Sequence, residues 1–117
     1  MIPDYDIVEV RKVNHVSANR RSANVVISPR DLAHAREVLL KVVSIIRLPG
    51  VTCTGGRQWS YADIVWVFLW SDSSAVGVAG AAARAMFTHK DLDERFIPPF
   101  PETEVVQVKG GTVRIGL

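Results

Sequence analysis

The sequence predicts an α+β domain of the ferredoxin-like split βαββαβ type, extended by an N-terminal strand and a C-terminal hairpin. Three observations lead to this prediction. From Asn24 onward, the apolar patterns follow the order strand, helix, strand, strand, helix, strand. The two most apolar strands, 24–27 and 61–70, take the positions that this architecture places at the centre of its sheet. The strands expected at the edges, around 51–54 and 104–109, carry more polar residues. We therefore expect two helices on one face of an antiparallel sheet.

The 117 residues are enough for one domain with its own core. We expect a single domain over 1–117, in which 1–22 form an N-terminal strand or arm and a loop, and 23–117 form the βαββαβ core. The segment 5–16 alternates imperfectly between apolar and charged residues, which indicates a strand added to one sheet edge or to another subunit. A flexible arm is the alternative.

The first helix has the clearest start signal in the chain. Ser28 can cap it, Pro29 suits its first position, and Asp31 follows three residues after the cap. Pro49-Gly50 ends it. Between these signals, apolar residues recur at helical spacing and predict a buried stripe. The stripe consists of Leu32, Ala35, Leu39, Val42, Val43 and Ile46.

A second helix is expected over 73–89, built largely of small residues. Gly77 and Gly80 would each cost such a helix about 1 kcal/mol relative to alanine. We expect its backbone to lie close to the bulky side chains of the preceding strand. After it, three prolines within 96–101 exclude helix, and Gly110-Gly111 predicts a closing hairpin.

The strand over 61–70 is apolar on both of its sides, so both need cover. One set of alternating residues includes the aromatic side chains of Trp66, Phe68 and Trp70. The other set is aliphatic. If the aromatic set packs on the small-residue helix, then Val65, Val67 and Leu69 form an open face that would bury itself in a homodimer. In the opposite register, the tryptophans line an open face and a pocket. The first arrangement fills space better, and we expect it.

Composition bounds the function only broadly. Hydrophobic residues make up 48% of the chain and charged residues 22%, as in ordinary globular proteins. The single cysteine, Cys53, permits no intrachain disulfide, which fits the cytoplasm. The N-terminus lacks a signal-peptide pattern, and the apolar window 64–83 is interrupted by Asp72 and serines, so we expect no membrane span.

No pattern in the sequence predicts catalysis or a metal site. His15, His34 and His89 are scattered and match no metal-ligand spacing. Cys53 lies in a predicted strand, where a small buried residue is the simpler interpretation than a nucleophile. We therefore assign no catalytic residue, no metal ligand and no cofactor, and expect a protein that is not an enzyme.

One cluster suggests a binding site for a small apolar or aromatic molecule. Arg57, Trp59 and Tyr61 follow the Gly55-Gly56 turn and combine a cation with aromatic rings. Trp66 and Trp70 would complete this site. The simpler alternative is a tryptophan folded back over the end of the sheet.

The first half of the chain is basic: 1–58 hold nine Lys or Arg against five Asp or Glu, whereas 59–117 hold five against seven. Arg11, Lys12, Arg20 and Arg21 could therefore form a patch that binds nucleic acid. The sequence disfavours this, because a face of Val65, Val67 and Leu69 offers no surface on which bases could stack.

The leading hypothesis is accordingly a self-associating, dimeric cytoplasmic protein that binds a small apolar or aromatic molecule. A module that docks another protein through its apolar sheet face is the first alternative, and weak nucleic-acid binding through the basic half is the second.

Overall fold

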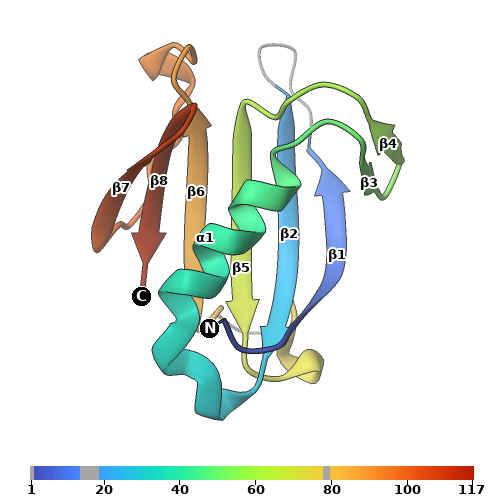
Figure 1. Cartoon of the computed structure of the whole chain (residues 1–117), viewed down its shortest axis with the longest axis vertical. Coiled ribbons are helices and arrows are strands. Elements are labelled where there is room, and N and C mark those ends of the chain that lie inside the picture. Colours follow the sequence, from blue (N-terminus) through green and yellow to red (C-terminus); the bar gives the residue numbers. More distant parts are fainter. Residues whose placement is uncertain (1, 14–18, 78–79) are drawn as a thin grey trace.

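The centre of the protein is a six-stranded sheet covered on one face by a single long helix, α1 (Ala35–Ile46) (Figure 1). The structure is a computed structural model that describes residues 2–13, 19–77 and 80–117. The sheet has the order β1-β2-β5-β6-β8-β7. Its strands are β1 (Tyr5–Lys12), β2 (Arg20–Ile27), β5 (Ile64–Trp70), β6 (Ala83–His89), β7 (Glu104–Val108) and β8 (Gly111–Gly116).

The sheet is mixed, because β2 and β5 run parallel while the other neighbouring strands run antiparallel. The chain leaves β2, passes through a 3-10 helix at Pro29–His34 and continues into α1, which returns it to the start of β5. Parallel neighbours need such a crossover, since a tight turn can join only antiparallel strands. The helical segment does begin at Pro29 as predicted, but its first turns are 3-10 and the α-helix starts only at Ala35. The Ser28 side chain makes no capping hydrogen bond, and Leu32, predicted in the buried stripe, is exposed.

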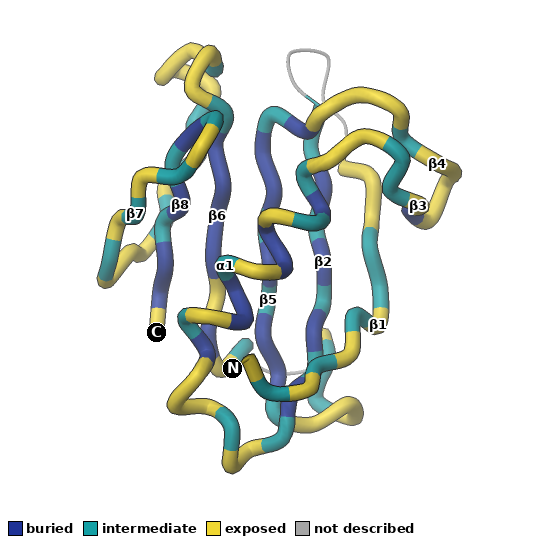
Figure 2. Tube along the Cα trace, in the orientation of Figure 1, coloured by how far each residue is buried: buried dark blue, intermediate teal, exposed yellow. Residues whose placement is uncertain are grey.

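The core lies between α1 and the sheet. The helix contributes an aliphatic stripe that faces the aliphatic side of the central strands, as expected for an amphipathic helix. In Figure 2 the central strands β5 and β6 are mostly buried, whereas the outer strands β1 and β7 are not. The buried residues of α1 are Ala35, Val38, Leu39, Val42, Val43 and Ile46.

The ferredoxin-like prediction is wrong in three respects. The sheet is mixed rather than antiparallel, and α1 is the one long helix among the described residues. The strand predicted around 51–54 is β3 (Val51–Cys53), and it pairs with β4 (Gly56–Gln58) in a separate hairpin instead of joining the large sheet. This hairpin is fastened to β1, where the Thr54 backbone N–H donates to the Val10 carbonyl at 2.8 Å.

The helix predicted over 73–89 is also wrong. Ser73–Ala75 forms a short 3-10 helix and Ala83–His89 forms β6. Gly77 has a φ of 77°, which no continuing α-helix allows. The small residues serve a different purpose, since Ala83 and Ala85 lie buried on the side of β6 that faces the core. Small side chains in a sheet let α1 lie close to the strand.

The remaining predicted strands are confirmed. The N-terminal strand adds to the sheet edge beside β2, and its predicted last residues, 14–16, lie outside the described residues. The C-terminal hairpin joins β7 to β8 through the turn at Gly110. Among the described residues, no helix is long and apolar enough to cross a membrane.

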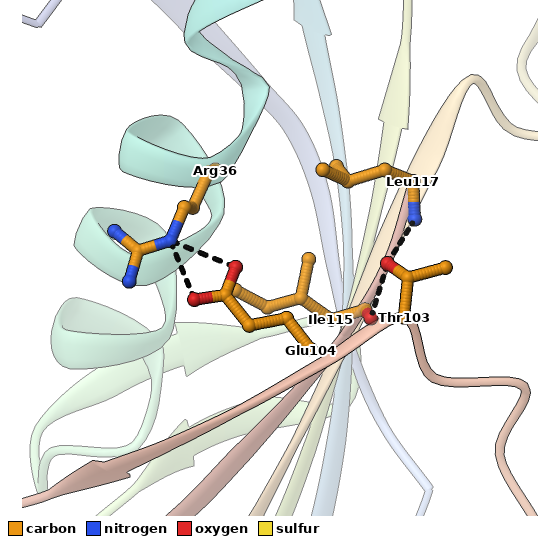
Figure 3. Close-up of polar contacts among 5 residues, drawn as sticks. All are labelled: Arg36, Thr103, Glu104, Ile115 and Leu117. Carbon is orange, nitrogen blue, oxygen red and sulfur yellow. Dashed lines mark hydrogen bonds and ion pairs between the residues drawn. The ribbon is translucent and has the colours of Figure 1, made fainter.

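The edge strand β7 is tied to the helix by one ion pair. Arg36 Nε donates to both carboxylate oxygens of Glu104 at 2.9 Å (Figure 3). Next to it, the Thr103 hydroxyl donates to the Ile115 carbonyl at 3.1 Å and accepts from the Leu117 N–H. The hydrogen bond and the charge of Arg36 hold the pKa of Glu104 below its usual value. The ion pair thus adds a link from β7 to the helix to the pairing of β7 with β8.

Candidate functional site

The register of β5 decides which side chains the open face of the sheet presents. Val65, Val67 and Leu69 are fully buried and belong to the core cluster under α1. The expectation that these three residues form an open face for a dimer is therefore wrong. Trp66 and Phe68 lie on the opposite side of the strand, where each is half-buried.

The pairing with β2 explains this register. In β2 the buried positions Ala23, Val25 and Ile27 alternate with half-buried ones, of which Ser22 and Asn24 are polar. Ser22 lies opposite Trp66 and Asn24 opposite Phe68. Polar side chains are poor partners for an aliphatic helix stripe, so they turn away from α1 and the aromatic residues turn with them. This signal was present in the sequence, but the prediction began the strand at Asn24 and missed it.

The open face carries a cluster that combines aromatic rings with guanidinium groups. We call it the arginine–aromatic face. It consists of Arg20, Trp66, Phe68, Arg84, Met86 and Arg114, which come from the four neighbouring strands β2, β5, β6 and β8. Phe68, Arg84, Met86 and Arg114 are site residues that the sequence did not bring together, because three of them lie on strands whose place in the sheet was unknown.

Strand register arranges these residues in two rows across the sheet. One row runs from Trp66 to Met86 on β6 and on to Arg114 on β8. The other places Phe68 directly opposite Arg84. Adjacent strands are about 4.8 Å apart, so each aromatic ring has a guanidinium group within one or two strands. Met86, opposite Trp66 and Arg114, is fully buried, whereas Arg84 is exposed.

The charge on this face is positive. The guanidinium carbon of Arg20 lies 5.7 Å from the centre of the Trp66 ring, in a cation–π contact. Arg114 donates to the Thr88 hydroxyl at 3.1 Å and lies 3.7 Å from the Glu102 carboxylate. On β2, β5, β6 and β8, the described residues on this side include three arginines and no carboxylate, while Asp6 and Glu9 of the edge strand β1 lie at its border. The face can therefore attract an anion.

At one end of the face, Trp70 and Asn24 are hydrogen-bonded to each other. The Trp70 ring N–H donates to Asn24 Oδ1 at 3.1 Å, and the Asn24 amide donates to Glu9 at 3.2 Å. Trp70 is only 6% exposed, so it supports this end of the face rather than offering a surface. At the edge beside β8, the Pro101 carbonyl lies 2.8 Å and the Phe100 ring 3.7 Å from where a Cβ of Gly116 would be. Only a glycine lets the 97–101 connection pass so near the sheet.

Arg21 lies on the other side of the sheet from Arg20 and is fully buried. It donates to the carbonyls of Ile46 at 2.7 Å and Leu48 at 2.6 Å, and also to that of Ser60. Burial lowers the pKa of Arg21, and Cys53 nearby acts in the opposite direction. Burial likewise raises the pKa of the Cys53 thiol, which keeps it neutral at pH 7. Arg21 therefore holds the C-terminal end of α1 and is not accessible to a ligand.

The other basic residues predicted for nucleic acid lie at the β1 edge. Arg11 is exposed and pairs with Glu9 at 3.2 Å. It lies opposite Ser22, hence on the side of the arginine–aromatic face, whereas the exposed Lys12 lies opposite Arg21 on the helix side. The predicted patch is thus divided between the two faces of the sheet.

The predicted cluster at Arg57 is a second, separate combination of cation and ring. The guanidinium of Arg57 lies 5.0 Å from the centre of the Trp59 ring, which is 72% exposed. This pair belongs to the β3–β4 hairpin and the connection after it, and Tyr61 follows at 58% exposure. Trp66 and Trp70 belong to the sheet instead, so the five predicted ligand residues are divided between two places.

Four hollows on the described surface are lined by none of these rings, although Arg84 of the arginine–aromatic face lines one of them, together with Pro101 and Gly116. The largest, about 670 Å³, opens at the C-terminal ends of β2 and β5 and is lined by Ser28, Arg30 and Ser71 among others. It also has an acidic lining from Asp4, Asp6, Asp31 and Asp72. Hydrogen bonds from Ser74 hold the pKa of Asp72 below its usual value. None of the four hollows is lined by Trp66, Phe68, Trp59 or Tyr61.

The two histidines in the described part of the chain, His34 and His89, form no second site. His34 is exposed at the end of the 3-10 helix, and His89 Nδ1 accepts the Asp91 N–H at 3.1 Å. His15 lies outside the described residues. Within residues 2–13, 19–77 and 80–117, no group of three or more His, Cys, Asp or Glu residues is placed to hold a metal ion.

Comparisons with protein-family models, with curated proteins and with solved structures found no match for this chain. The candidate site therefore stands on geometry alone.

Proposed function

We propose that this protein is a binding module that takes an aromatic, anionic ligand on its arginine–aromatic face. The observation that carries the proposal is the contact of Arg20 with the Trp66 ring, next to Phe68 opposite Arg84. Rings stack on flat ligands, and guanidinium groups pair with carboxylate or phosphate oxygens. The absence of carboxylates from this side of the four described central strands supports an anionic ligand over a cationic one.

Self-association remains a prediction, but the surface that would form the interface differs from the one predicted from the sequence. The aliphatic residues expected at the interface lie beneath α1, so a dimer packed sheet against sheet would have to use the arginine–aromatic face. A two-fold axis through this face would bring arginines of both copies together, which opposes such a dimer unless carboxylates at its border compensate. An anionic ligand has no such cost.

Binding can be tested by tryptophan fluorescence with three matched probes. Adenosine monophosphate is aromatic and anionic, adenosine is aromatic only, and ribose 5-phosphate is anionic only. The Trp59→Phe variant removes the exposed tryptophan of the hairpin, so that the signal comes from Trp66 and Trp70. We expect the monophosphate to bind more tightly than either of the other probes.

Arg84 provides the test variant and Arg57 the matched control. Both side chains are exposed arginines, but only Arg84 lies on the proposed face. Arg84→Gln should weaken monophosphate binding several-fold, because charge-assisted hydrogen bonds are strong and exposed ones are partly screened. Arg57→Gln should leave it unchanged. Equal binding of all three probes, or equal effects of both variants, would refute the proposal.

A further inference from the structure

We infer that the ligand of the arginine–aromatic face is a single strand of nucleic acid, bound with little preference for base sequence. The inference rests on the proposed function and specifies its ligand. It reverses the sequence-based argument against nucleic acid, which assumed an aliphatic open face. That face is aromatic and cationic in the structure.

The first step concerns the number of stacking positions. Trp66 and Phe68 are two residues apart on one strand, and their side chains stand on the same side. Such neighbours are about 6.7 Å apart along a strand. Two adjacent rings on a sheet can each stack one base of a strand whose bases are splayed. A mononucleotide would use only one of these positions.

The second step concerns the cations. The Arg20 guanidinium lies over Trp66, and its Nε donates to the Val13 carbonyl at 3.0 Å, so its charge is held at this side of the ring. Arg84 lies beside Phe68, and Arg114 lies in the row of Trp66 two strands away. The positive groups thus extend over four strands instead of gathering at one point. This arrangement follows a chain of phosphates better than it surrounds a single one.

The third step concerns shape. Trp66 and Phe68 line none of the four hollows described above. Small molecules bind mainly in concave sites that bury most of their surface, whereas stacking platforms for single strands lie on open sheet faces. An extended ligand therefore fits this surface better than a small one. A duplex fits poorly, because its bases are stacked on one another and their faces are not accessible.

The expected tolerance for base sequence follows from Asn24. Its amide is the one on this face that could read a base edge, but its oxygen accepts from Trp70 and its nitrogen donates to Glu9. These two hydrogen bonds fix the orientation of the amide and leave one N–H and one lone pair, so it cannot turn to match different bases. Stacking and phosphate contacts, which every sequence provides, would then supply most of the affinity.

The experiment compares a 12-mer of thymidine with three other probes by fluorescence anisotropy. These are a mixed-sequence 12-mer, a 12-bp duplex and inorganic polyphosphate. We expect both single strands to bind equally and at least about tenfold more tightly than the duplex and the polyphosphate. Affinity for the single strands should fall with rising salt, because bound phosphates release counterions.

Two variants locate the binding on the face. Phe68→Leu keeps an apolar side chain and removes the ring, and we expect about a tenfold loss of affinity. Arg84→Gln should reduce the slope of log affinity against log salt by about 0.7, the value for one phosphate contact in a single strand. Arg57→Gln on the hairpin is the matched control and should change neither quantity. Far-UV circular dichroism checks that Phe68→Leu folds. Because Arg84 is exposed, its replacement by Gln should leave the fold unchanged.

The outcomes separate this inference from the proposed function. If adenosine monophosphate binds at the face but the 12-mers bind no more tightly, the inference fails and the proposed function stands. Equal binding of polyphosphate and 12-mers also overturns the inference, since bases would contribute nothing. If light scattering shows a dimer that Phe68→Leu dissociates, and no probe binds, the face is an interface between copies and both proposals fail.

Discussion

The two sides of β5 carry apolar residues of different kinds and meet different surroundings. Toward α1, the strand presents Val65, Val67 and Leu69, all fully buried in aliphatic contacts. Away from α1, it presents Trp66, which contacts Arg20, and Phe68, which lies opposite Arg84, and both rings are half-buried. The same strand therefore contributes to the core on one side and, in our proposal, to a binding surface on the other. The apolar character of a side chain does not by itself indicate whether the side chain belongs to the core or to a surface.

The adjacent residues Arg20 and Arg21 show the same division with identical chemistry. Arg21 holds three carbonyls in the interior, and Arg20 stacks on Trp66 at the open face. A one-residue step along a strand reverses the side on which a side chain lies. Changes on the helix side should accordingly alter stability, and changes on the open side should alter binding.

The largest effect on stability is expected from comparing truncations at two neighbouring positions of β5, one on each side of the strand. Leu69→Ala removes buried atoms beneath α1 and should lower the free energy of unfolding by about 3 kcal/mol. Phe68→Leu, on the open side, should lower it by less than about 1.5 kcal/mol. Urea denaturation of both variants measures the difference. Similar losses at the two positions would mean that the open side is as much a part of the core as the helix side.

The second prediction concerns the two arginines. Arg21→Met leaves three carbonyls without their donor, and we expect a loss of about 2 kcal/mol of stability. Arg20→Met removes a cation–π contact and an exposed hydrogen bond to the Val13 carbonyl, and it should cost less than about 1 kcal/mol. Thermal denaturation of the pair gives the comparison. A greater loss for Arg20→Met would contradict the assignment of Arg21 as the internal link.

The smallest effect is expected at the sheet edge, where Arg36 holds Glu104. Because the pKa of Glu104 is lower in the folded protein than in the unfolded chain, this contact stabilises fully above the usual glutamate pKa of about 4.3. Its contribution is lost as the pH falls through the lower, folded value. A Glu104→Gln variant should lose this part of the acid dependence, as a series of melting temperatures between pH 3 and 7 would show. The control is Glu102→Gln, which lies near the same edge but pairs more loosely, at 3.7 Å.

The sequence predicted the elements better than their arrangement. The start of the helix region at Pro29 and the hairpin at Gly110 carry local signals, and both are confirmed. The segment 83–89 was assigned to a helix because alanines favour helices, although Arg84, Met86 and Thr88 alternate with Ala83, Ala85 and Phe87 as in a strand. Propensity is a weak indicator when tertiary packing requires small residues in a sheet.

The candidate site could not be predicted for a different reason. Phe68, Arg84 and Arg114 meet only through the pairing of β5 with β6 and of β6 with β8. Nothing local in the chain encodes that strand order. The side on which Trp66 lies was predictable in principle from Ser22 and Asn24, but only once β2 was known to lie beside β5.

The parallel pairing of β2 with β5 has a consequence for how the chain folds. Arg20 pairs with Ile64, 44 residues further along, so the middle of the sheet closes only after a long loop has been brought together. Topologies with such distant pairing fold slowly. During synthesis, β2 would have an unpaired edge until Trp70 has left the ribosome, and unpaired edges of apolar strands promote aggregation. We therefore expect a fragment that ends before β5 to fail to fold and to need a chaperone to stay in solution.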